Sequence, residues 1–165
     1  MVQQLTDPSV GLTSFQQALG DGEISPVRCK LDPDLYVLVD EPAGTPRFTY
    51  ARIEEDGTVT AIAILAIVEP MEGLPCFQLG YAVPEQYRNQ GRAKKVVKAA
   101  LAEHQHGFAN ANVHTFYVEA VVGADNPISQ AVAAATISDQ PEAGSDKFAE
   151  VPVLQYVRKF EPAGG

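Results

Sequence analysis

Residues 88–98 hold five of the chain's twelve basic residues, although the whole protein has 21 acidic residues and a formal net charge of −9. The five cations are Arg88, Arg92, Lys94, Lys95 and Lys98. Gly91 lies between the two arginines, directly before a segment whose apolar residues recur at helical spacing. Unpaired backbone N–H groups at a helix N-terminus favour an anion, and a glycine lets the backbone approach a ligand oxygen closely. These residue types in this order predict a loop that binds pyrophosphate.

The alternative for the same cations is a solvated helix face without a ligand. A lysine-rich helix taken alone would favour that interpretation. Here the glycine loop stands directly ahead of the helix, so the positive charges lie where an anion would bind. We therefore favour the anion site over the solvated face.

Glu119 is the candidate general base, because it is the only acidic residue in the strand-like segment from Val113 to Val122. Alternation places its side chain on the same strand face as Tyr117 and Val121. If that face borders a cleft, the carboxylate could take a proton from an ammonium group. The alternative is an ordinary exposed glutamate on the sheet surface.

The histidines and cysteines do not predict a metal site or a thiol nucleophile. His104, His106 and His114 have no partners at metal-ligand spacing, and His104 falls on the apolar face of the predicted helix. Cys29 and Cys76 have no base nearby in the sequence. We therefore predict a protein without a metal cofactor, with His104 in its core.

Four consecutive strands precede the glycine loop and must position it. Their apolar and β-branched patterns predict strands over residues 35–40, 48–53, 58–69 and 76–83. Asp56 and Gly57 predict a β-hairpin between the second and the third of these strands. Short connections predict an antiparallel meander. Gly80 inside the fourth strand indicates a bulge or a close approach of another backbone.

Three helices and two further strands complete the predicted elements. Helices are expected over residues 13–20, 93–104 and 126–138, strands over 113–122 and 151–160, and a polar loop over 139–147. Thr13 or Ser14 would cap the first helix. Asn126 would cap the third helix, with Pro127 at its first helical position.

Two blocks of sequence resemble the Gcn5-related N-acetyltransferase superfamily. Arg88-Asn89-Gln90-Gly91-Arg92-Ala93 matches its nucleotide-binding pattern, which reads Gln or Arg, two residues, Gly, one residue, then Gly or Ala. Val118–Val122, followed by Asn126 and Ser129, is similar to the family's fifth strand and the start of its next helix. The resemblance is good over residues 47–160 and poor over residues 1–35.

The resemblance implies an acyl-CoA N-acyltransferase fold, which is an α/β fold of the α+β type. One domain over residues 1–165 would contain a mixed, mostly antiparallel, twisted sheet with helices on both faces. In this family the strand corresponding to residues 77–83 splays away from the next strand. The pantetheine arm of the cofactor pairs with the backbone that this exposes.

The resemblance also implies that the chain binds acetyl-CoA. Backbone N–H groups of residues 89–94 would hold the pyrophosphate, Val83 would hold the pantetheine amide, and basic side chains would add charge. The implied cofactor-binding residues are Val83, Arg88, Asn89, Gln90, Gly91, Arg92, Ala93, Lys94, Asn126 and Ser129. A neutral primary amine, on a small molecule or a peptide, would attack the thioester directly. Glu119 or a water chain would take its proton.

Ala133 departs from the family pattern, because many members have a tyrosine seven residues after the asparagine, as general acid toward the thiolate. An acetyltransferase works without it, since CoA thiolate is a fair leaving group and water can protonate it. The departure leaves open a non-catalytic acyl-CoA-binding or regulatory module of the same fold. An enzyme that acylates aminoacyl-tRNA is a further alternative, which the net charge of −9 disfavours.

Length and composition limit which classes of protein the chain can belong to. A chain of 165 residues suffices for one domain with a buried core, and its longest apolar run, residues 61–68, is strand-sized. We predict a cytoplasmic protein, because no secretory signal is evident and two cysteines give no disulfide framework. The expected partner is an amine acceptor, not nucleic acid or a membrane. A homodimer is left open.

Overall fold

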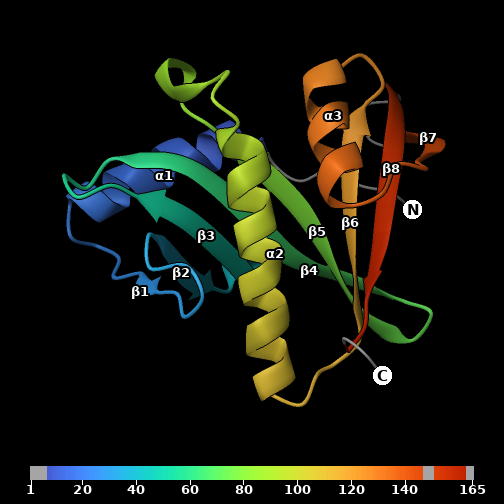
Figure 1. The fold of residues 1–165 in the computed structure, drawn as a ribbon, viewed down its shortest axis with the longest axis horizontal. Coiled ribbons are helices and arrows are strands. Elements are labelled where there is room, and N and C mark those ends of the chain that lie inside the picture. The colour runs from blue at the N-terminus through green and yellow to red at the C-terminus, as the bar shows by residue number, and fades with distance from the viewer. Residues whose placement is uncertain (1–6, 147–150, 163–165) are drawn as a thin grey trace.

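The computed structural model describes residues 7–146 and 151–162. Its eight strands form one sheet in the order β1-β2-β3-β4-β5-β6-β8-β7 (Figure 1). The strands are β1 (Val27–Arg28), β2 (Leu35–Asp40), β3 (Arg47–Ile53), β4 (Val59–Met71), β5 (Leu74–Ala82), β6 (Phe116–Gly123), β7 (Glu142–Asp146) and β8 (Val151–Phe160). The helices are α1 (Pro8–Gly20), α2 (Arg92–Asn110) and α3 (Pro127–Thr136), with short 3-10 turns η1 (Pro42–Gly44) and η2 (Glu85–Tyr87).

The predicted antiparallel meander is confirmed. Strands β2, β3, β4 and β5 pair antiparallel in chain order, with Thr49 opposite Ile64 and Ile64 opposite Gly80. Gly57 adopts a φ of 88° in the hairpin turn between β3 and β4, as its position after Asp56 predicted. Because one parallel pair joins this meander to the remaining strands, the sheet is mixed and mostly antiparallel, as expected.

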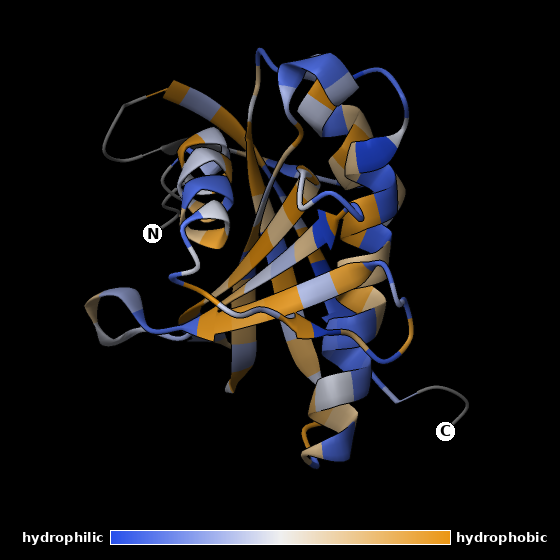
Figure 2. Cartoon of the chain, turned by 90° about the vertical axis from the view of Figure 1, so that its left-hand side faces the viewer, coloured by the Kyte–Doolittle hydropathy of each residue, from blue (hydrophilic) through white to orange (hydrophobic). Residues whose placement is uncertain are grey.

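Helices cover both faces of the sheet, which separates the core into two layers (Figures 1 and 2). Alternation along β4 sends Ala63 and Leu65 toward α2 and α3, and Ile62 and Ile64 toward α1. Helix α1 packs closely against β4, since a Cβ on Gly11 would lie 3.2 Å from the Ile64 side chain. The predicted helices on both faces are therefore confirmed.

Strands β5 and β6 pair in parallel over a short stretch and then diverge. Their register joins Cys76 to Tyr117 and Gln78 to Glu119 and ends there, although β5 runs on to Ala82 and β6 to Gly123. The register of β4 and β5 shifts between Val68 and Met71 and is regular at Gly80. Gly80 is therefore not a bulge; it lies where the two strands separate.

The first helix begins earlier than the sequence analysis expected. Helix α1 starts at Pro8, and its N-cap is Asp7, whose side chain accepts a hydrogen bond of 2.9 Å from the Ser9 N–H. The expected cap at Thr13 or Ser14 is wrong. Asp7 and Pro8 are themselves a strong start signal, since aspartate caps well and proline favours the first helical position.

Other bounds also differ from expectation: β6 begins at Phe116 and not at residue 113, and α3 ends at Thr136. Residues 142–146 form β7 on the edge of the sheet, within the segment expected as a polar loop, and residue 147 lies outside the described residues. Pairing with β8 overrides the low β-propensity of Glu-Ala-Gly-Ser-Asp. Helix α2 runs on to Asn110.

No helix in the described ranges has both the length and the apolar character needed to cross a membrane.

His104 lies in the core among aromatic rings, as predicted. It is 1% exposed, its Nδ1 lies 2.8 Å from the Tyr50 hydroxyl oxygen, and its ring stands edge-on to Phe48 and Phe77. Desolvation in this setting lowers the pKa of His104 to about 3. The imidazole is therefore neutral in the folded protein at ordinary pH.

We expect the protein to lose stability as the pH falls from 7 to 4. The folded pKa of His104 is about 3 and the ordinary value is 6.5, so the unfolded chain binds more protons within this window. Each pH unit inside it costs about 1.4 kcal/mol of unfolding free energy. Urea denaturation at pH 7, 5 and 4 should show a smaller loss for His104→Gln, which does not titrate. Identical losses in both proteins would remove His104 as the cause.

Candidate functional site

The gap between the diverging ends of β5 and β6 opens into a cavity of about 1110 Å³. Leu79 and Val122 line it from the α2 and α3 face of the sheet, and Ala82 and Ser9 line it from the α1 face. The cavity therefore passes through the sheet. It exceeds the roughly 300–1,000 Å³ of ordinary small-molecule pockets, so two ligands could occupy it end to end.

The predicted anion loop lies at one mouth of this cavity. Asn89 and Gly91 both adopt left-handed backbone conformations, with φ values of 63° and 73°, and Gly91 is the N-cap of α2. A Cβ on Gly91 would meet no atom within 4 Å, so open space lies in front of the loop. The first N–H groups of α2 have no acceptor in the preceding turn of that helix. The loop thus combines unpaired donors with room for an anion.

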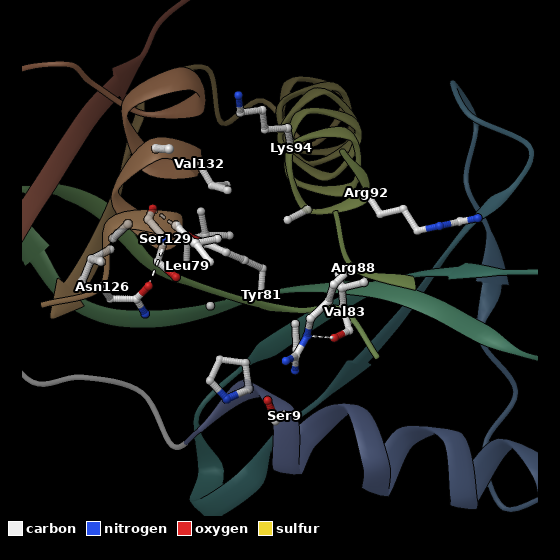
Figure 3. A pocket seen from close by; sticks show the side chains of 18 of the residues that line it. Ser9, Leu79, Tyr81, Val83, Arg88, Arg92, Lys94, Asn126, Ser129 and Val132 are labelled. Atoms are coloured by element: carbon white, nitrogen blue, oxygen red, sulfur yellow. Dashed lines mark hydrogen bonds between the residues drawn. The ribbon is translucent and has the colours of Figure 1, made fainter. Parts of the chain in front are cut away.

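The side chains of Arg88, Arg92 and Lys94 extend from the loop in three different directions (Figure 3). Arg92 points to the β3–β4 hairpin, where its Nη1 lies 3.4 Å from Glu54 Oε1 and 3.2 Å from Thr60 Oγ1. Its guanidinium also lies over the Tyr87 ring. Lys94 is exposed at the cavity rim, on the side opposite Arg88. The positive charge is therefore spread around the cavity and not gathered at one point.

Arg88 extends toward α1. Its Nε donates a hydrogen bond of 3.0 Å to the Val83 carbonyl oxygen, which fixes the base of the guanidinium. Figure 3 shows the guanidinium pointing toward Ser9 at the start of α1. The family resemblance implies that Arg88 adds charge at the pyrophosphate, and the residue types of the loop do not predict the direction of this side chain.

The start of α3 forms the opposite wall of the cavity. Asn126 caps the helix by accepting a hydrogen bond of 3.1 Å from the Ser129 N–H, as predicted. The Tyr81 hydroxyl on β5 donates a hydrogen bond of 2.9 Å to the Ser129 carbonyl oxygen, across the gap between the strands. Desolvation raises the pKa of Tyr81, so the hydroxyl keeps its proton at neutral pH. This bond holds the two walls of the cavity at a fixed separation.

Glu119 is buried, and the alternative of an exposed surface carboxylate does not apply. Its side chain, 8% exposed, accepts hydrogen bonds from Gln78 Nε2 at 3.2 Å and from Gln155 Nε2 at 2.7 Å. Glu119 itself does not line the cavity, but Gln78 does. The Gln78 side chain therefore lies between the cavity and this carboxylate.

The cavity brings together nine of the eleven candidate residues from sequence. They are Val83, Arg88, Asn89, Gly91, Arg92, Ala93, Lys94, Asn126 and Ser129. Gln90 is exposed beside the loop, and Glu119 lies behind Gln78. Among the described residues, no group of three His, Cys, Asp or Glu side chains is placed to hold a metal ion.

The part of the cavity wall that α1 forms was not predicted from the sequence. Asp7, Pro8 and Ser9 line the cavity. Asp7 and Pro8 signal a helix start, but no local pattern says against which surface that helix packs. Ala133, where many family members have a tyrosine, is fully buried in the core.

Neither cysteine is placed for nucleophilic chemistry. Desolvation, helped by nearby Glu103 and Asp32, raises the pKa of Cys29 to about 12. Burial, with Glu119 as a lesser cause, raises the pKa of Cys76 to about 12. Both thiols therefore stay protonated at neutral pH.

Comparison with known families gives a match over most of the chain. The model described as the acetyltransferase (GNAT) family matches residues 18–135. Among curated proteins, none matches the chain significantly.

Solved structures share the fold at low sequence identity. A spermidine N-acetyltransferase chimera from Vibrio cholerae and hSSAT superposes with a TM-score of 0.50 at 14% identity, over 69% of this chain and 66% of that one. A ribosomal-protein-S5-alanine acetyltransferase from Vibrio fischeri superposes with a TM-score of 0.51 at 12% identity, over 73% and 64%. The chain spans just under two thirds of the length of these proteins, and the likeness shows the fold.

Proposed function

The chain belongs to the GNAT acetyltransferase family, and from this premise we propose that it transfers an acetyl group from acetyl-CoA to a primary amine. The cavity that crosses the sheet is the observation that carries the proposal, since such a passage lets two reactants meet from opposite faces. The structural neighbours include a spermidine N-acetyltransferase chimera and a ribosomal-protein-S5-alanine acetyltransferase, which supports an amine acceptor.

We place the cofactor on the α2 and α3 face. The pyrophosphate would accept hydrogen bonds from the N–H groups at the start of α2, with Asn89, Gly91 and Ala93 around it. Lys94 and Arg92 would add charge. The pantetheine arm would lie along the β5 backbone near Val83, where β6 no longer pairs with it. Asn126 and Ser129 would border the arm from α3.

The acceptor amine would reach the thioester from the α1 face. Nucleophilic attack on the carbonyl carbon forms the C–N bond, the C–S bond then breaks, and CoA leaves as the thiolate. Glu119 would take the amine proton through a bound water, with Gln78 orienting the carboxylate, and water would protonate the thiolate. Holding the two reactants in one cavity supplies much of the rate, because proximity replaces a bimolecular encounter.

A non-catalytic acyl-CoA-binding module is the second candidate, and Ala133 is the observation that favours it. That residue leaves α3 without the tyrosine that protonates the thiolate in many family members. Incubation with acetyl-CoA and a panel of amines separates the two functions. An enzyme releases free CoA thiol in step with acetylated amine, whereas a binding module releases none.

We expect acetyl-CoA and CoA to raise the midpoint of thermal unfolding. A ligand that binds only the folded state at one hundred times its dissociation constant stabilises it by about 2.7 kcal/mol. NADH and ATP should stabilise far less, because neither has a pantetheine arm to occupy the gap beside β5. A thermal-shift series with all four ligands at equal concentration measures this. Equal shifts would reduce the loop to a general anion site.

A further inference from the structure

The Arg92 side chain is held by two separate segments of the chain. Its Nη1 donates hydrogen bonds to Thr60 Oγ1 at 3.2 Å and to Glu54 Oε1 at 3.4 Å. Its Nε donates to Gln90 Oε1 at 3.2 Å, and its guanidinium carbon lies 5.2 Å from the centre of the Tyr87 ring. Arg92 therefore connects the loop before α2 to the hairpin between β3 and β4.

The hairpin end of this connection is fixed by the sheet. Thr60 lies in β4 and is 1% exposed, and its hydroxyl donates a hydrogen bond of 3.1 Å to Glu54 Oε1. The two groups that accept from Arg92 are thus bonded to each other. The Arg92 side chain, 26% exposed, ends against a buried strand and not against a free surface side chain.

The loop needs support from outside because its backbone conformation is an uncommon one. Asn89 and Gly91 have φ values of 63° and 73°, which lie in the left-handed region. For a residue other than glycine, such a conformation persists only where the surrounding structure imposes it. The Arg92 side chain contacts Tyr87 and Gln90, and these two residues flank Asn89 in the chain. Its contacts therefore restrict the conformations that are open to the loop.

We propose that Arg92 is a positioning residue for the pyrophosphate, which it serves through Glu54 and Thr60 and not as a direct ligand. The inference rests on the proposed cofactor site and narrows the part of Arg92 in it. Figure 3 shows the side chain extending away from Ser129 on the opposite wall of the gap. The charge of Arg92 already has a carboxylate partner, whereas Lys94 lies exposed at the rim.

Glu54→Gln distinguishes the two roles of Arg92 by the sign of its effect. For a phosphate ligand restrained by Glu54, the substitution would free the guanidinium and remove a negative charge, so CoA would bind more tightly. For a positioning residue, the substitution loosens the loop. CoA should then bind about three- to tenfold more weakly, which is the scale of one partly exposed charged hydrogen bond.

Glu55→Gln is the matched control, because Glu55 is the next residue in the chain and is also exposed. It changes the net charge by the same amount and leaves the contacts of Arg92 in place. Solvent and salt screen a charge at such a site, so CoA affinity should stay within about twofold of the wild type. Isothermal titration calorimetry measures the affinities, and tighter binding of CoA by Glu54→Gln would overturn the proposal.

Exchanging the two charges provides a second test. Arg92→Glu alone places two carboxylates together and should weaken CoA binding by at least about tenfold. Adding Glu54→Arg restores the pair in the reverse order and should recover most of that loss. A double variant that binds CoA as weakly as Arg92→Glu would show that the positive charge must lie at position 92, and the positioning role would fail.

Pantetheine separates loop positioning from a general loss of structure, because it has no pyrophosphate. Its affinity should be equal in the wild type and in Glu54→Gln, and equal weakening of pantetheine and CoA would overturn the inference. Binding is the readout throughout. A wild type that binds CoA but acetylates no amine would therefore refute the proposed transfer and leave this inference standing, whereas a wild type without affinity for CoA would refute both.

Discussion

Gly91→Glu should reduce the affinity for acetyl-CoA by about three orders of magnitude. The backbone at Gly91 has a φ of 73°, and its Cβ would project into open space at the cavity mouth. A carboxylate there would face the pyrophosphate. Two unit charges about 4 Å apart at an effective dielectric constant of about 20 repel by about 4 kcal/mol, which is close to 1,000-fold. Isothermal titration calorimetry with CoA measures the change.

Gly91→Ala is the matched control, because it adds the Cβ without the charge. A non-glycine residue in the left-handed region costs roughly 1–2 kcal/mol of stability. The Cβ itself meets no neighbour, so CoA affinity should fall by less than about tenfold. If Gly91→Glu binds CoA as tightly as the wild type, the pyrophosphate does not lie in front of this loop.

Glu119→Gln should lower kcat by about 10²- to 10⁴-fold, which is the usual contribution of a general base. CoA affinity should hardly change, because Glu119 lies behind Gln78 and away from α2. The substitution also has a structural cost. Both carboxylate oxygens accept from side-chain amides, so a glutamine would bring an NH₂ group against another NH₂ group. Loss of one buried partner costs roughly 1–3 kcal/mol of stability.

Gln155→Leu separates the chemical effect from the structural one. It removes one hydrogen bond to Glu119 while keeping the carboxylate and the contact with Gln78. Its stability should fall about as much as that of Glu119→Gln, and its kcat should stay within about threefold of the wild type. Comparable falls in kcat for both variants would assign the effect to packing. A fall below threefold in Glu119→Gln would make water the proton acceptor.

Local sequence predicted the parts of the cavity that local chemistry determines. The glycine at the start of α2 and the Asn126-Pro127 pair at the start of α3 are fixed by backbone preferences within a few residues, and both helices begin there. The Asp56-Gly57 turn fixed the hairpin in the same way. Alternation along β6 placed Glu119 on the face of Tyr117 but could not show whether that face is covered.

Contacts between distant segments were not predicted. From its position in the loop, the Arg88 side chain could contact a phosphate or a second ligand equally well. Ser9 lies near it only because α1 packs against β4 and β5. Residues 142–146 lack strand character and form β7 because β8 offers a free edge. Such outcomes depend on which surfaces meet, and residue order within one segment does not contain that information.

The short parallel joint between β5 and β6 has a consequence for the order of folding. Apart from the start of α1, the lining of the cavity comes from chain positions 78–94 on one side and 120–132 on the other. The meander before the joint forms through neighbouring hairpins, whereas the joint itself closes a loop that includes all of α2. Pairings between residues far apart in sequence form slowly, because the loop entropy is lost before contacts compensate for it. We infer that the cavity is completed late, after the first five strands have already assembled.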